Sequence, residues 1–91
     1  MTNEEVAAIF DELAVMLRAK KELPFKFRAY EKAADAIRAL TLPIEQYRHE
    51  HDLREIPGVG DAIAKKVNDL LDTGTFPLLE RLRSGLAEAT Q

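Results

Sequence analysis

Apolar residues recur at steps of three and four along most of this 91-residue chain. The first segment carries them at Val6, Ile9, Phe10, Leu13 and Leu17. The second carries them at Phe27, Tyr30, Ala34, Ile37 and Leu40. Such spacing gathers apolar side chains on one face of an α-helix, and no segment alternates with the period of two that a half-buried strand requires. The pattern predicts an all-α fold, a bundle of four to five short helices.

Turn and capping residues divide this pattern into separate helices. Thr2 or Asn3 is suited to cap the first helix, and Pro24 interrupts the pattern after it. Thr41 is suited to cap a short third helix with Pro43 in its first turn. We expect helices at about 3–20, 25–40, 43–48, 52–56, 60–73 and 76–84.

Composition limits the class of protein. With 46% apolar and 32% charged residues, we expect 1–91 to form a single small domain that ends in a polar tail at 85–91, with no room for a polymerase catalytic unit. The absence of cysteine excludes disulfides and thiolate metal sites, and the run from His49 to Asp52 lacks the spacing and the third ligand of a zinc site. Neither a signal peptide nor a long apolar stretch is present, so we expect a cytoplasmic protein with no membrane partner.

Charge is segregated along the chain although the net charge is only −3. Residues 1–15 carry four acids and no base, whereas residues 18–38 carry seven bases against three acids. A basic surface must therefore be assembled from 18–38 together with the segment that holds Lys65 and Lys66. Ordinary solvated helix faces are the alternative interpretation of the same charges.

The segment Ile56-Pro57-Gly58-Val59-Gly60 separates two short apolar helical patterns and predicts a very tight turn. We expect Gly58 and Gly60 to adopt backbone angles that are closed to other residues, and without a Cβ their amides are open to a ligand. The turn also presents the amino end of the following helix, where unpaired N–H groups and the positive end of the helix dipole attract an anion. A phosphate of a nucleic-acid backbone fits that description, since it would be held without reference to base identity.

This segment resembles the helix-hairpin-helix motif of DNA repair and replication proteins, and 56–60 match its hairpin pattern at every position. The run Phe-Lys-Phe-Arg-Ala-Tyr-Glu-Lys-Ala-Ala at 25–34 is similar to the second helix of the N-terminal, lyase-type domain of X-family DNA polymerases. Thr73, Gly74, Leu78, Leu79 and Leu82 continue the resemblance, which covers most of 4–83.

The resemblance implies binding to gapped or nicked DNA near a 5′-phosphate, in a repair or replication role. In some members of the family, a lysine that corresponds to Lys66 removes a 5′-deoxyribose phosphate through a Schiff base. The resemblance also places a weakly held Na⁺ or K⁺ at the backbone carbonyls of Arg54, Ile56 and Val59, and no tightly bound cofactor is expected. The expected DNA-binding residues are Gly58, Val59, Gly60, Asp61, Ala62, Lys65, Lys66, Lys26, Arg28, Tyr30 and Arg54.

The two adjacent lysines are expected to differ. At about 100° per residue, Lys66 lies about 60° from Ile63 on the apolar stripe and Lys65 about 160° away. Lys65 is therefore expected to face water and contact phosphate. Partial burial, with Lys65, Lys26 or Arg28 nearby, would lower the pKa of Lys66 and favour the neutral amine of a Schiff-base nucleophile. The alternative is a boundary lysine whose ammonium contacts DNA.

The sequence departs from the lyase-type pattern at its 5′-phosphate pocket. Lys26 and Tyr30 are retained and Arg54 replaces a lysine, but a histidine position holds Phe25 and two lysine positions hold Ala62 and Leu78. Three functions stay open: a DNA-binding module, a protein-interaction adapter that has lost DNA binding, and an active lyase. A polymerase or another repair protein is a further expected partner.

Overall fold

The computed structural model describes the backbone of residues 1–89 and the side chains of residues 1–85. Its elements are α-helices and one short 3₁₀ helix, with no strand in the described part, which confirms the predicted all-α bundle. In chain order they are α1 (Asn3–Ala19), α2 (Pro24–Arg38), α3 (Ile44–Glu50), η1 (Leu53–Glu55), α4 (Asp61–Thr73) and α5 (Pro77–Ala89).

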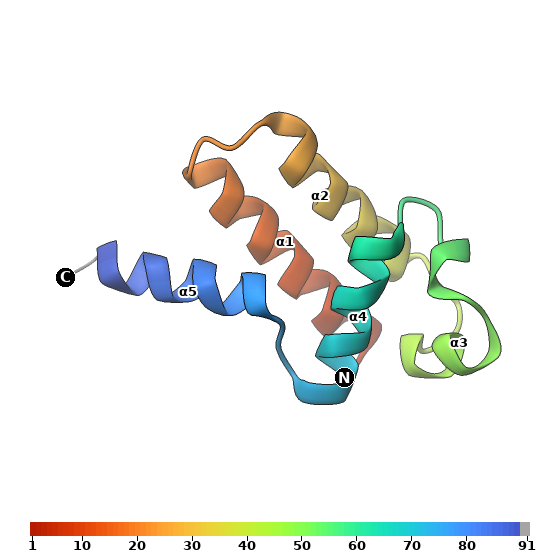
Figure 1. The fold of residues 1–91 in the computed structure, drawn as a ribbon. Helices are drawn as coiled ribbons and strands as arrows, with labels where there is room; N and C mark the ends of the chain where they lie inside the picture. Colours follow the sequence, from red (N-terminus) through yellow and green to blue (C-terminus); the bar gives the residue numbers. More distant parts are fainter. Residues whose placement is uncertain (90–91) are drawn as a thin grey trace.

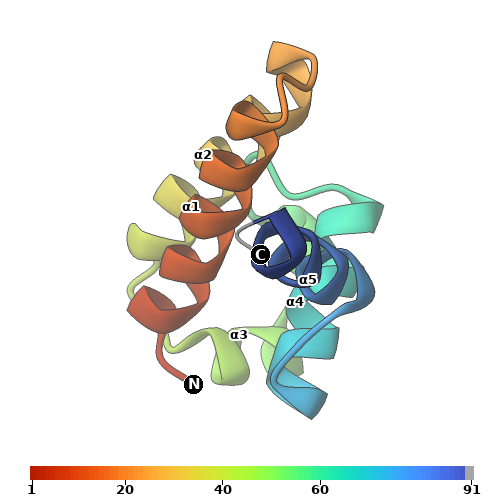
Figure 2. The ribbon, with the colours of Figure 1, turned by 90° about the vertical axis from the view of Figure 1, so that its left-hand side faces the viewer.

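Helices α1 and α2 lie side by side in opposite directions, and α4 and α5 pack on the same side of that pair (Figures 1 and 2). Thr2 begins α1 with a capping box, in which its hydroxyl accepts from the Glu5 amide and the Glu5 carboxylate accepts from the Thr2 amide. Pro24 stands in the first turn of α2, where its missing N–H costs nothing.

Three predicted boundaries were wrong. Pro43, and not Thr41, occupies the N-cap position of α3 without a side-chain cap, and the helix continues through Glu50. The predicted helix at 52–56 is a single 3₁₀ turn, because Asp52 caps it by accepting from the Arg54 amide and Ile56 is already extended. Helix α5 continues to Ala89, so the tail expected from residue 85 is helical over 85–89, where alanine and leucine favour helix. Positions 90 and 91 of that tail lie outside the described residues.

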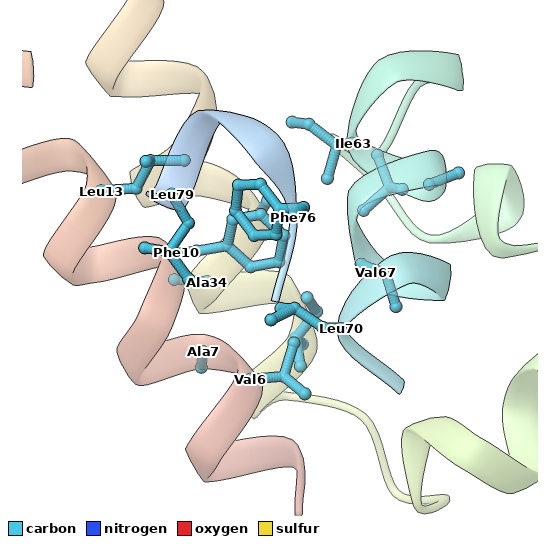
Figure 3. Packing of buried hydrophobic residues seen from close by; sticks show 14 of the residues in the cluster. Val6, Ala7, Phe10, Leu13, Ala34, Ile63, Val67, Leu70, Phe76 and Leu79 are labelled. Carbon is cyan, nitrogen blue, oxygen red and sulfur yellow. The ribbon is translucent and has the colours of Figure 1, made fainter. Parts of the chain in front are cut away.

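The core joins all the helices. Phe10 stacks on Tyr30 of α2 with ring centroids 6.0 Å apart, and on Phe76, just before α5, at 6.1 Å. Figure 3 shows the buried side chains that point toward this centre: Val6, Ala7, Phe10, Leu13, Ala34, Ile63, Val67, Leu70, Phe76 and Leu79. No polar or charged side chain is buried in the described part, so the core is held by apolar packing.

Asn3 links the start of α1 to the start of α3. Its side-chain amide donates to the Leu42 carbonyl at 2.9 Å, and its side-chain oxygen accepts from the Ile44 amide at 2.6 Å. Because α3 leads directly into η1 and the glycine turn, this contact fixes the approach of the chain to the candidate site.

Candidate functional site

The glycine turn is anchored to the core by two apolar side chains. Ile56 is 1% exposed and Val59 4% exposed, and the Val59 amide donates to the Ile56 carbonyl at 3.0 Å. Between them Gly58 has φ +86°, a conformation that costs other residues about 1–2 kcal/mol. The turn is thus a fixed structure whose shape depends on Gly58.

Gly60 has a different role from the one expected. Its φ of −97° and ψ of −168° are extended backbone that any residue adopts, so the prediction of a restricted backbone angle was wrong at this position. A Cβ added there would meet no atom within 4 Å. Gly60 therefore leaves open space at the amino end of α4, and because it has no side chain, no side-chain oxygen caps that end.

The amino end of α4 presents unpaired backbone donors. Asp61 and Ala62 are both exposed and lie in the first turn, where helical N–H groups have no partner four residues earlier. The Gly60 carbonyl accepts the Ala64 amide at 2.9 Å, so the regular helix begins immediately. These donors and the helix dipole converge beside the turn, as the sequence predicts.

Arg54 is held by two carboxylates next to these donors. Its guanidinium contacts Asp52 at 2.6 Å and Asp61 at 3.0 Å. The Arg54 guanidinium, followed by the Arg54 amide, lowers the pKa of Asp52 to about 2. Arg54 is thus close to the expected phosphate position but already neutralised.

The expected cations fall into two groups. Lys26 pairs with Glu22 at 3.1 Å and Lys65 with Asp69 at 3.7 Å, so both resemble Arg54 in having an acidic partner. Among the residues the structure describes, Arg28 and Lys66 form no ion pair. The segregated charges also pair between helices, since Arg38 of α2 contacts Glu4 and Asp11 of α1. Of the seven bases at 18–38, only Arg18, Lys26 and Arg38 form ion pairs in the described part of the chain.

The two lysines of α4 differ as the helical spacing predicts. The side chain of Lys65 is 78% exposed, whereas Lys66 is partly buried with its Nζ atom 5.9 Å from the centroid of the Tyr30 ring. Burial lowers the pKa of Lys66, Asp69 opposes that change, and Lys65 adds to it. The lowered pKa agrees with the prediction, although Lys26 and Arg28 do not contribute to it.

The glycine turn separates two depressions. One, of about 430 Å³, is a polar pocket lined by Arg48, Asp52, Arg54, Asp61, Lys65 and Asp69, among others. The other has a volume of about 670 Å³ and is called the apolar groove. Its main lining residues are Leu17, Phe25, Tyr30, Ala62, Ile63 and Leu78. Gly58 and Gly60 border the apolar groove, which also receives Lys26. The expected site residues are therefore divided, with Arg54 and Lys65 on one side of the turn and Lys26 and Tyr30 on the other.

Sequence reasoning missed two basic residues near the turn. The aliphatic part of Lys32 lies about 3.4 Å from the position of a Cβ on Gly58, and Arg81 lines a depression together with Lys65 and Lys66. In the described part neither forms an ion pair. Lys32 follows Arg28 by four residues on α2, and that spacing on one helix face was the available signal.

An all-helical bundle with an uncapped helix start behind a Pro-Gly-apolar-Gly turn defines the helix-hairpin-helix class. The family model described as "Helix-hairpin-helix domain" matches residues 1–76, most of the chain. The chain belongs to this family. No helix in the described part is long and apolar enough to cross a membrane.

Proposed function

We propose that this domain is a sequence-nonspecific DNA-binding module for gapped or nicked DNA with a 5′-phosphate, with a role in repair or replication. The amides at the start of α4 bind an oxygen of the phosphate, and the Pro57–Gly60 turn brings the strand to them. The observation that carries the proposal is the exposed, uncapped start of α4, in front of which Gly60 leaves open space.

The unpaired basic residues supply the electrostatic attraction. Arg28 and Lys32 of α2 line a depression that reaches Gly58, and Lys66 and Arg81 line another beside α4. Three of the four acids of α1 have a basic partner, because Glu4 and Asp11 contact Arg38 and Glu12 contacts Arg83. We expect weak, micromolar and strongly salt-dependent binding, since few cations contact the strand.

A monovalent cation is part of the same proposal. The carbonyls of Arg54, Ile56 and Val59 would hold Na⁺ or K⁺ beside the bound phosphate. The Ile56 carbonyl accepts one hydrogen bond, from Val59, which leaves one of its two lone pairs for an ion. Such an ion neutralises phosphate charge without any acidic ligand.

The position of Lys66 favours a second candidate function, the removal of a 5′-deoxyribose phosphate. The neutral amine attacks the aldehyde carbon of the open sugar, and loss of water gives the imine. Loss of a C2′ proton to water then breaks the C3′–O bond, the 3′ oxygen leaves as the phosphate of the DNA strand, and hydrolysis of the imine frees the lysine. Partial burial of Lys66 supports this role, because burial disfavours the charged ammonium and lowers the pKa of the amine. Lys66→Ala should abolish borohydride trapping on that substrate, while Lys65→Ala should retain it. Equal trapping by Lys66→Ala would exclude Lys66 as the nucleophile.

Calorimetric titration with a gapped duplex at low and moderate salt tests DNA binding. Gly60→Ala places a methyl group at the expected phosphate position without strain, and loss of one charge-assisted hydrogen bond, about 1.5–3 kcal/mol, predicts at least a tenfold weaker complex. Gly85→Ala, within α5, is the matched control and should bind like the wild type. Wild-type protein that shows no salt-sensitive binding would contradict the proposal and favour the protein-interaction adapter.

A further inference from the structure

We propose that the apolar groove receives an unpaired nucleobase of the DNA strand whose phosphate the turn binds, and that the Phe25 ring provides the stacking surface. This inference rests on the proposed function and adds a preference for DNA with an unpaired base next to the bound phosphate.

The lining of the groove suits a neutral group better than an anion. Its walls are apolar, and the charged residues that line it are paired: Lys26 with Glu22, and Asp61 with Arg54. By the resemblance, a histidine would stand at position 25 and lysines at 62 and 78, where this chain has Phe, Ala and Leu. Transfer of a phosphate into such a groove would cost hydration without a charged partner, whereas a base loses little.

Phe25 differs from the other aromatic residues near the core. Its side chain is 66% exposed, whereas Phe10 and Phe76 are almost fully buried. It lies in the first turn of α2 and borders both the apolar groove and a depression lined by Arg28 and Lys32. Two acids, Glu31 and Asp35, line the same depression, and Glu31 is paired with Arg18. An exposed ring with basic residues beside it is the arrangement on which single-stranded nucleic acid stacks.

The groove continues directly from the expected phosphate position. Gly58, Gly60, Asp61 and Ala62 all line it, and the amides of Asp61 and Ala62 are the proposed phosphate donors. A base attached to that phosphate, or to the next one, therefore meets the groove first. A paired base cannot enter, because its partner strand holds it in the stack.

An acidic peptide and a second copy of the chain are the other conceivable occupants. The paired charges that line the groove give an acidic peptide no electrostatic advantage inside it, and Glu31 and Asp35 offset Arg28 and Lys32 in the depression beside it. A nucleobase requires none, and its stacking energy is independent of sequence. The shared boundary with the phosphate donors favours DNA over both alternatives.

The test compares two gapped duplexes with the same number of phosphates. In one, the nucleotide after the 5′-phosphate carries an unpaired base, and in the other a tetrahydrofuran group without a base replaces it. We expect wild-type protein to bind the first about tenfold more tightly by calorimetry, because stacking of one base contributes about 1–3 kcal/mol. Phe25→Ala should remove this preference and leave binding to the second duplex unchanged.

Leu23→Ala is the matched control, since Leu23 is a similarly exposed apolar residue outside the groove lining. It should retain the preference. Equal binding of both duplexes by wild-type protein, or a preference that survives Phe25→Ala, would overturn this inference and leave the proposed function intact. Absence of binding to either duplex would overturn both. A dimer by light scattering that Phe25→Ala converts to a monomer would identify a self-interface and also overturn the inference.

Discussion

The α1–α2 pair and the segment from η1 to α4 use their polar residues in opposite ways. In the pair, charges join different helices, as when Arg38 of α2 contacts Glu4 and Asp11 of α1. In the η1–α4 segment, the Asp52–Arg54–Asp61 contacts stay within ten residues of the chain, and the helix start beside them is uncapped. The first region is organised for packing, and the second leaves backbone donors open to a ligand.

This difference indicates how a small domain combines stability with an open site. Phe10 lies at the contact between α1, α2 and the chain before α5, and α1 contributes more buried apolar side chains than α2 or α4. The turn only has to be anchored by Ile56 and Val59. Substitutions in the two regions should therefore separate unfolding from loss of binding.

Phe10→Ala should have the largest effect. Removal of a fully buried ring that stacks on Tyr30 and Phe76 should lower the free energy of unfolding by about 3–5 kcal/mol, measured by urea denaturation. Val15→Ala, at an exposed position of the same helix, should change it by less than about 0.5 kcal/mol. A small decrease in the free energy of unfolding for Phe10→Ala would contradict the comparison, because the α1–α2 pair would then not be the main source of stability.

Gly58→Ala should have the next largest effect. Its positive φ should cost about 1–2 kcal/mol in the free energy of unfolding. Gly60→Ala should leave that free energy almost unchanged, since its backbone is extended and its surroundings are open. Both should weaken DNA binding. Equal stability losses in the two variants would show that the turn relaxes away from the observed geometry.

Asp61→Asn should strengthen DNA binding about two- to fivefold at low salt, the size of an exposed charge interaction. It removes a carboxylate beside the phosphate donors and frees Arg54 from one of its two partners. Glu80→Gln, which removes an exposed acid from α5, should have a smaller effect. Weaker binding by Asp61→Asn would mean that the paired Arg54 geometry is itself required.

The smallest expected effect is a dependence of stability on acid pH. The pKa of Asp52 is about 2 in the folded protein, below the ordinary value of 3.8, because Arg54 stabilises the carboxylate. A lowered pKa contributes stability that is present above pH 4 and is lost as the pH falls toward 2. Asp52→Asn should therefore melt slightly below the wild type at pH 5, and the difference should vanish near pH 2. A difference in melting temperature that stays constant between pH 5 and pH 2 would mean that Asp52 acts through its cap of η1 and not through its charge.

Much of the fold was predictable because it follows from local chemistry. The three- and four-residue apolar repeat identified the main helices, and Pro24 marked a boundary correctly. The start of α3 was not predictable from Thr41 and Pro43, because Asn3, about forty residues away, supplies the hydrogen bond to the Ile44 amide. The predicted end of α5 at residue 84 was too early, because the polar residues after Ser84 indicated a tail, whereas the alanines and the leucine there favour helix.

The candidate site was predictable in its backbone and less so in its charges. Helical spacing separated Lys66 from Lys65 correctly, because both belong to one rigid element. Which cations are neutralised depends on neighbours, such as Glu22 for Lys26 and Asp61 for Arg54, and spacing alone does not give their geometry. The division of the site by the turn likewise arises only from the packing of α2 against the turn and α4.

The stacking of Tyr30 on Phe10 also makes tyrosine fluorescence a probe of ligand binding. The chain has no tryptophan and only two tyrosines, so its ultraviolet emission comes from Tyr30 and Tyr47. Tyr30 touches both the core, through Phe10, and the edge of the groove, beside Lys66. In the Tyr47→Phe variant, the intrinsic fluorescence would come from Tyr30 alone. A change in its intensity would therefore report ligand binding at the groove, without dye or label.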